Sequence, residues 1–175
     1  MHVKQSLVIV AALAAIVGVS VLAYRSAVPE HPPLCQICQR AIPKETGFRM
    51  ETATGTILAC CARCAMHHMI HEPGLFKKAW ATDYVSRRMI SAQSAYYDEG
   101  GDVHYCTPPG TSVERQPEGV RVRVYDRCLP TLVAFATREE ATTYQRQHGG
   151  RVLTYDEAWE GVRQQSLGAE VTQSP

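Results

Sequence analysis

Five of the seven cysteines in this 175-residue chain lie between Cys35 and Cys64, in a pattern typical of a metal site. Cys35 and Cys38 form one CxxC pair, and Cys61 and Cys64 form a second pair after 22 intervening residues. A CxxC turn directs two thiolates at one ion, and two such turns supply the four thiolates that tetrahedral zinc accepts. The spacing therefore predicts a metal site at these four cysteines, with Cys60 either replacing Cys61 or serving as a fifth thiol.

A segment rich in histidine and methionine directly follows the second pair. On a helix, one stripe would contain Cys64, His67, His68 and His71. Imidazole and thioether groups beside thiolates favour copper(I), whereas zinc accepts imidazole but not thioether. We therefore expect copper or zinc as the bound metal and include His68 as a candidate ligand. In the alternative interpretation the histidines form a solvated face, and Met66 and Met69 fill the core.

The other two cysteines, Cys106 and Cys128, lie in the second half of the chain. Cys128 follows a predicted strand and precedes another, a position from which a rigid scaffold easily presents a ligand. Two interpretations stay open: Cys106 and Cys128 form a disulfide, or they are independent thiols, one of them a transient copper ligand. His104 is close enough in sequence to join Cys106.

Other chemistry is less well supported by the sequence. In an oxidising compartment the clustered cysteines could form disulfides, and Cys35 with Cys38 could act as a thiol–disulfide carrier, although no thioredoxin-like βαβ pattern surrounds them. No nucleophile–base pair, phosphate loop or carboxylate pair stands out, so we do not expect an enzyme. Four acidic residues are interpreted as turn and surface positions: Asp83, Asp98, Glu99 and Asp102.

The N-terminal segment is apolar and without charge from Leu7 to Ala23. As a helix it would span about 25 Å, close to the thickness of a hydrocarbon core. Lys4 precedes it and Arg25 follows, a weak charge bias that favours a cytoplasmic amino end. We predict a transmembrane anchor over residues 1–24, with a cleaved signal peptide as the alternative. Either places the remaining chain outside the inner membrane, in the periplasm or extracytoplasmic space.

The rest of the chain predicts an α+β fold in which the order strand, strand, helix, strand occurs twice. A capping box at Thr137 and Glu140 predicts a helix that ends at Gly149. Strands are expected over 47–51, 56–59, 78–85, 91–98, 120–125, 132–136 and 151–155, and helices over 60–72, 137–148 and 156–165. The predicted domains are a proline-rich linker (25–34), a cysteine-rich ββαβ unit (35–90), a second ββαβ unit (91–165) and a disordered tail (166–175).

The formal net charge of +1 gives no electrostatic footprint for nucleic acid, so we do not expect nucleic acid as a partner.

The second half resembles the NosL family of copper-binding accessory proteins. The matching stretches are residues 82–85 (TDYV), 91–97 (SAQSAYY), 132–141 (LVAFATREEA) and 147–153 (QHGGRVL). The region that they span is about half of the chain. The resemblance implies two ββαβ units, related in fold to organomercurial lyase, and a role in copper delivery for nitrous oxide reductase maturation. Leu129 departs from the family pattern, which usually carries methionine there, and Cys60, Cys61 and Cys64 are an addition that looks like a zinc knuckle.

Residues and resemblance together predict a membrane-anchored, extracytoplasmic accessory protein that hands copper to a client metalloenzyme. Thiolate exchange would move the ion, with Cys60 or Cys128 as a mobile ligand. The alternative is an assembly module in which the four paired cysteines hold a structural zinc ion, with no metal transfer.

Overall fold

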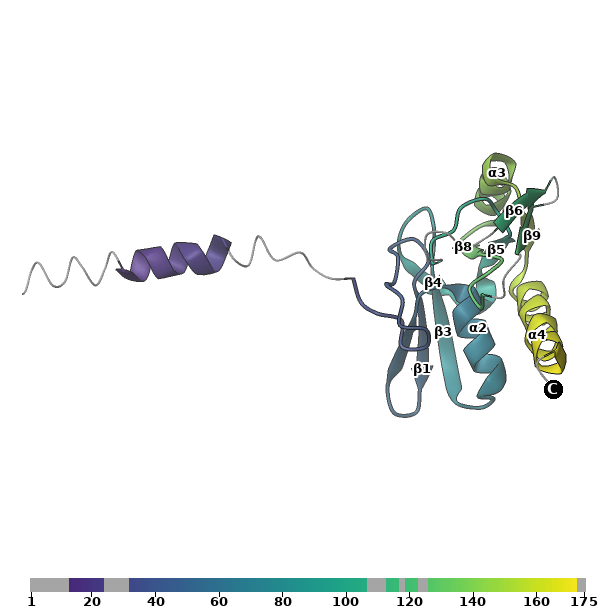
Figure 1. Ribbon diagram of the computed structural model, residues 1–175, viewed down its shortest axis with the longest axis horizontal. Coiled ribbons are helices and arrows are strands. Elements are labelled where there is room, and N and C mark those ends of the chain that lie inside the picture. Colours follow the sequence, from purple (N-terminus) through teal and green to yellow (C-terminus); the bar gives the residue numbers. More distant parts are fainter. Residues whose placement is uncertain (1–12, 24–31, 107–112, 117–118, 123–125, 173–175) are drawn as a thin grey trace, which may run out of the picture. The chain divides into compact units, whose positions relative to one another are not determined.

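A computed structural model describes residues 13–23, 32–106, 113–116, 119–122 and 126–172 (Figure 1). For 113–116, 119–122 and 169–172 only the backbone is described. The chain divides into two compact units, Met1–His31 and Pro32–Pro175.

In the first unit, residues 13–23 form a helix with exposed side chains, drawn in purple in Figure 1. Among the described residues, no helix combines the length and the apolar character that crossing a membrane requires. The predicted anchor over 1–24 and the predicted linker over 25–34 include positions outside the described residues, so both assignments stay predictions.

The first sheet of the second unit is antiparallel, with the strand order β2-β1-β3-β4. Phe48 is paired with Ala59 on one side and with Ala81 on the other. The strands of this sheet are β1 (Phe48–Thr52), β2 (Thr56–Ala59), β3 (Phe76–Thr82) and β4 (Met89–Ser91), and the helix α2 (Ala62–His71) lies between β2 and β3 in the chain. Phe48 and Met50 alternate along β1 and are both buried, as a strand with one face in the core requires.

The second sheet has the order β8-β5-β9 and is also antiparallel. The strands of this sheet are β5 (Tyr96–Glu99), β8 (Leu132–Phe135) and β9 (Arg151–Leu153). The helix α3 (Arg138–His148) lies between β8 and β9 in the chain, and the helix α4 (Tyr155–Thr172) follows β9. A hairpin of β6 (Val113–Gln116) and β7 (Gly119–Val122) lies between β5 and β8 in the chain, and a 3-10 turn, η1 (Ala92–Ser94), precedes β5.

The expected α+β class is confirmed, and each sheet follows the order ββαβ: β1-β2-α2-β3 and β5-β8-α3-β9. The capping box is confirmed too, because the Thr137 side chain accepts from the Glu140 amide and Glu140 accepts from the Thr137 amide. Gly149 ends α3 with φ 75°, in the conformation that glycine adopts without strain.

The two sheets meet at the end of β3. Asp83 forms an isolated parallel bridge with Ala134 of β8, and the Tyr84 amide donates to the Ala134 carbonyl at 2.8 Å. The Asp83 carboxylate accepts from the amides of Ser86 at 2.7 Å and Ala136 at 2.9 Å. Burial opposes ionisation here, but these hydrogen bonds outweigh it and lower the pKa of Asp83.

The placement of three acidic residues at the surface was wrong. Asp83, Asp98 and Glu99 are 1%, 0% and 8% exposed. Asp83 is buried because it satisfies amides at the junction of the sheets, and Glu99 because two arginines pair with it. Their positions at strand ends resemble those of ordinary turn residues, so the sequence alone did not distinguish the two cases.

Three element boundaries also differ from expectation. The segment expected as one strand over 91–98 is divided by η1, and β6 was not among the expected strands. Part of the strand expected over 120–125 lies outside the described residues. α4 runs to Thr172, past the expected end at Gln165. Ser166, the next residue, is buried, and its hydroxyl donates to the Val162 carbonyl at 2.9 Å.

Candidate metal centre

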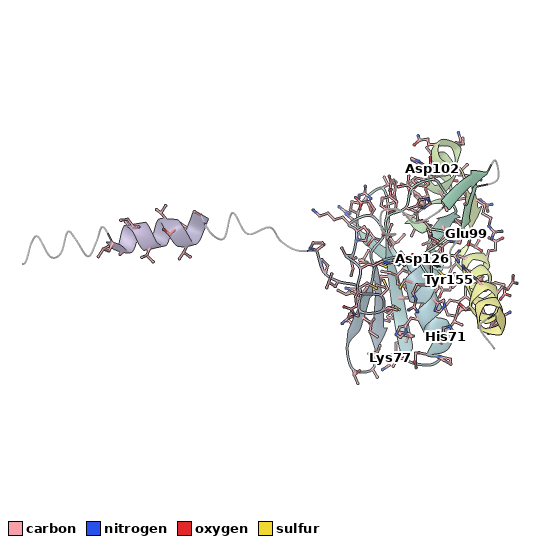
Figure 2. The ribbon with its side chains drawn as sticks, in the orientation of Figure 1. His71, Lys77, Glu99, Asp102, Asp126 and Tyr155 are labelled. Atoms are coloured by element: carbon pink, nitrogen blue, oxygen red, sulfur yellow. The ribbon has the colours of Figure 1, made fainter. Side chains whose placement is uncertain are left out.

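All seven cysteine side chains are free thiols, and they gather in one region of the second unit. Cys35 and Cys38 precede β1, Cys60 and Cys61 link β2 to α2, and Cys64 lies in the first turn of α2. Cys106 follows β5 and Cys128 precedes β8. The fold therefore brings cysteines from both halves of the chain together (Figure 2 draws sulfur in yellow).

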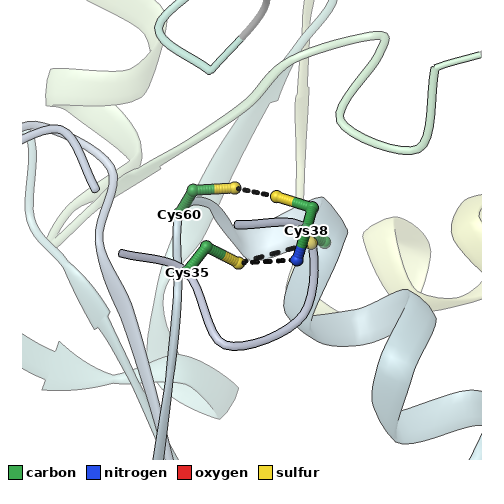
Figure 3. Close-up of side chains that lie close together, drawn as sticks. Cys35, Cys38 and Cys60 are labelled. Carbon is green, nitrogen blue, oxygen red and sulfur yellow. Dashed lines mark hydrogen bonds between the residues drawn. The ribbon is translucent and has the colours of Figure 1, made fainter. Parts of the chain in front are cut away.

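Four of these thiols form a compact group: Cys35, Cys38, Cys60 and Cys64, whose Sγ atoms all lie within 4.8 Å of one another. The Sγ atoms of Cys35 and Cys64 are 3.9 Å apart, and those of Cys38 and Cys60 are 3.5 Å apart (Figure 3). Sulfur atoms around a tetrahedral zinc ion, each about 2.3 Å from it, lie about 3.8 Å from one another. The four-thiol group thus has the size that one thiolate-bound ion requires.

Backbone contacts position the first two cysteines. The Gln39 amide donates to the Cys35 carbonyl at 2.9 Å, and Gln39 has a positive φ of 62°, which closes the turn. The Cys38 amide lies 3.4 Å from the Cys35 sulfur (Figure 3). Gln36 attaches the turn to β2, because its amide donates to the Leu58 carbonyl at 2.9 Å and its side chain accepts from the Leu58 amide at 2.7 Å.

Cys61 caps α2 instead of joining the four-thiol group. Its sulfur accepts from the Cys64 amide at 3.4 Å, and its backbone is extended, as at other helix N-caps. Cys60, the residue before it, points into the four-thiol group. Cys60 thus takes the place that the sequence left open between Cys60 and Cys61.

Cys61 belongs to a second group with Cys60 and Cys106, in which the three Sγ atoms also lie within 4.8 Å of one another. The Cys106 thiol donates to the Cys60 carbonyl at 3.2 Å, and the Thr46 hydroxyl donates to the same carbonyl at 2.9 Å. The Cys128 sulfur lies 3.7 Å from that of Cys60. Cys60 is therefore a member of both thiol groups and also contacts Cys128.

An arginine–carboxylate pair fastens the two halves of the centre. Arg40 donates from Nη1 to Asp126 Oδ1 at 2.9 Å and from Nη2 to Oδ2 at 2.8 Å, and also to the Cys106 carbonyl at 3.0 Å. Asp126, labelled in Figure 2, in turn accepts from the Cys128 amide at 2.9 Å. The hydrogen bonds with Asp126, assisted by the nearby Cys128, raise the pKa of Arg40, so a fixed positive charge stands beside the thiols.

The thiols differ in acidity because they hydrogen-bond to one another. Donation from Cys60 and Cys64 lowers the pKa of Cys35, and donation from Cys60 and Cys61 lowers the pKa of Cys106 to about 5. Donation from Cys60, Cys61 and Cys64, with the charge of Arg40, also lowers the pKa of Cys128. The pKa values of Cys60, Cys61 and Cys64 are raised in return. Thiolates, the form that binds metal, are thus favoured at positions in both halves of the chain.

The candidate histidine ligands lie elsewhere. His68 packs edge-on against Phe76, with ring centroids 5.5 Å apart, and the rings of His67 and His71 are tilted, with centroids 4.6 Å apart. His104 contacts the Thr131 hydroxyl at 3.3 Å. In the described part of the chain, none of these rings joins either thiol group. Met66 and Met69 are buried in the core.

Three residues of the centre were not anticipated from the sequence: Thr46, Arg40 and Asp126. None has an unusual sequence context. The one hint is symmetry of position, because Arg40 comes two residues after Cys38 and Asp126 two residues before Cys128.

Comparison with known proteins gives a solved structure of the same fold. The "copper chaperone NosL from Shewanella denitrificans" aligns over 74% of this chain and 92% of its own, with a TM-score of 0.52 and 15% sequence identity. The fold is NosL-like. This supports the fold part of the resemblance noted in the sequence. No family model matches the chain.

In sequence, the chain is similar to the "HTH-type transcriptional repressor CutR" of Bacillus subtilis (strain 168), with 23% identity over 138 residues. The match covers 78% of this chain and 62% of the repressor. The chain therefore spans less than two thirds of the length of that relative.

Proposed function

We propose that this chain binds copper(I) as cargo at its cysteine centre and passes it to an extracytoplasmic client metalloenzyme. One observation carries the proposal: within a NosL-like fold, thiols from distant segments meet at distances that suit a shared ion. Thiolates favour copper(I) and zinc, and the name of the similar structure, a copper chaperone, supports copper.

Transfer by thiolate exchange needs an exposed ligand and mobile partners. Cys38 is partly exposed, whereas Cys35, Cys60 and Cys64 are fully buried. The client would therefore approach at Cys38 and take over one coordination bond at a time. Cys128, 3.7 Å from Cys60, can occupy the vacated position until the client's ligand arrives. An ion passed in this way is never without thiolate ligands.

Membrane attachment and an extracytoplasmic location belong to the same proposal. They rest on the uncharged run from Leu7 to Ala23, part of which is helical, and on the proline-rich residues after it. The regulatory activity named for the repressor is not carried over, because the chain spans only 62% of that protein.

A structural zinc site is the second candidate function. Four thiols in a compact, mostly buried group are what a closed zinc site presents, and the separations of 3.5 and 3.9 Å agree with a tetrahedral ion. In this case the ion would stabilise the fold and would not exchange.

Competition for copper(I) separates the two functions. The full chain, purified anaerobically in detergent, is titrated with copper(I) against a chromophoric copper(I) chelator, with and without one equivalent of zinc. We expect copper(I) to bind, to displace zinc and to return to the chelator within minutes. Cys35→Ser and Cys64→Ser should each weaken binding at least tenfold, whereas His67→Ala, on the same helix but outside the thiol groups, should not.

Zinc that resists copper(I) would support the structural function instead. A protein that retains neither ion would contradict both.

A further inference from the structure

The thiols outside the four-thiol group are packed as closely as those within it. The Sγ atoms of Cys60 and Cys61 are 3.9 Å apart, and Cys106 lies within 4.8 Å of both. Cys61 and Cys106 are 0% and 6% exposed, and Cys128, beside Cys60, is 1% exposed. A second set of soft donors thus lies next to the first, away from water.

We propose that the centre holds two thiophilic ions, bridged by the Cys60 thiolate. This inference rests on the proposed metal-binding function. One ion would lie in the four-thiol group, and the other would lie between Cys60, Cys61 and Cys106, with Cys128 alongside. Each thiol that binds an ion releases its proton to solvent, and no electron is transferred.

Cys60 is the residue whose position allows a bridge. It is the member common to both groups, and its sulfur lies 3.5 Å from that of Cys38 in one and 3.9 Å from that of Cys61 in the other. A thiolate sulfur has enough lone pairs to bind two ions at once. The Thr46 hydroxyl, 2.9 Å from the Cys60 carbonyl, holds this residue in place even when Cys106 has given up its proton.

Charge balance also favours a second ion. The cationic side chains beside the thiols are each paired with a carboxylate, Arg40 with Asp126 and Arg63 with Glu99. Several thiolates formed around a single ion in this buried region would therefore be compensated only in part, and buried unpaired charge is strongly unfavourable. A second ion offsets that charge where the thiols are most crowded.

The chemistry restricts the ions to the soft or borderline class that thiolates prefer, copper(I) or zinc. The three-thiol group suits copper(I), which accepts few ligands, and a zinc ion there would draw in Cys128 as its fourth ligand. Separate loading with each metal distinguishes the two.

Stoichiometry tests the inference. The full chain is loaded anaerobically with excess copper(I), or separately with zinc, desalted, and measured by native mass spectrometry and elemental analysis. We expect two ions per chain for at least one of these metals. Cys106→Ser should lose one ion and keep the other, and His67→Ala should keep both. A saturated chain with one ion for each metal would overturn the bridge and leave the proposed function standing, whereas a chain with none would overturn the proposed function itself.

Cadmium-113 NMR of the wild-type chain gives a second test that needs no variant to fold. Two cadmium resonances with a mutual scalar coupling through the shared sulfur are expected. A single resonance, or two without coupling, would overturn the bridge.

Discussion

The helices α2 and α3 occupy the same place in the two ββαβ units, yet they are held in opposite ways. α3 begins with a capping box formed by its own neighbours, Thr137 and Glu140, at the surface. α2 begins with a thiol cap inside the metal centre, and its Arg63 is buried against Glu99 and Gln165, far along the chain. The cap of α3 is supplied by residues of its own first turn, whereas α2 depends on distant partners. The difference indicates that α2 is positioned for the centre.

The strand β5 shows the same contrast at two adjacent residues. Glu99 accepts from Arg63 and also from Arg151 Nε at 2.7 Å, which pairs it with two cations. Asp98 lies near Gly101 and Gly150 at the end of α3, and neither of its carboxylate oxygens has a partner in the described part of the chain. The charge of Glu99, beside α2, is therefore compensated by two arginines, whereas Asp98, beside α3, has no cationic partner of this kind among the described residues.

Removing the partner of Arg63 should have the largest effect. Glu99→Ala leaves a guanidinium that is 2% exposed without its carboxylate, and breaking a buried pair in this way costs about 3–5 kcal/mol. Urea unfolding of the metal-free chain measures the loss. Glu160→Ala, which breaks the exposed pair with Arg163 on α4, is the matched control and should leave the midpoint unchanged. Equal effects of the two variants would show that α2 does not depend on its distant partner.

Neutralising Asp98 should act in the opposite direction. Burial, with the charge of Glu99, raises the pKa of Asp98 from 3.8 to about 7. The unfolded chain therefore loses this proton at lower pH than the folded chain does, and the free energy of unfolding falls as pH rises through that interval. Asp98→Asn should remove this slope and stabilise the protein at pH 8 by up to about 4 kcal/mol.

Urea unfolding at pH 5 and pH 8 checks this, with the exposed Asp156→Asn as the control. A parallel loss of stability at both pH values would contradict the explanation.

The capping box should contribute less. Thr137→Ala removes the acceptor for the Glu140 amide, and the loss of such a cap costs about 1 kcal/mol. Thr137→Ser keeps the hydroxyl and should restore most of that stability. The effect should be the same with and without bound metal, because neither Thr137 nor Glu140 belongs to a thiol group.

The thiol cap of α2 gives the smallest expected change and the clearest contrast. Sulfur is a weak acceptor, so Cys61→Ser should stabilise the metal-free chain by about 0.5 kcal/mol. The same variant should lose one ion from the loaded chain, since it removes a donor of the second group. Thermal unfolding before and after metal loading measures both effects. If the effect of Cys61→Ser were the same with and without metal, as expected for Thr137→Ala, the contrast between the two helices would be removed.

The sequence predicted the locally encoded parts of this protein. The strands expected over 47–51 and 56–59 and the helices expected over 60–72 and 137–148 were located to within a few positions, and the box at Thr137 acts within a few residues. Of the two CxxC pairs, Cys35 and Cys38 both lie in the four-thiol group, whereas from the second pair only Cys64 does, with Cys60 in place of Cys61. The end of α4 was placed too early, at Gln165 and not at Thr172.

What the sequence could not determine is which thiols meet. The choice of Cys60 over Cys61 for the four-thiol group follows from the end of β2 and the start of α2, and the arrival of Cys106 and Cys128 follows from the junction of the two sheets at Asp83. Arg40 and Asp126 became a pair only when that junction brought them within 2.9 Å. Ligand type and spacing are properties of the chain, whereas the set of atoms that can share one ion depends on distances between segments that only the folded structure fixes.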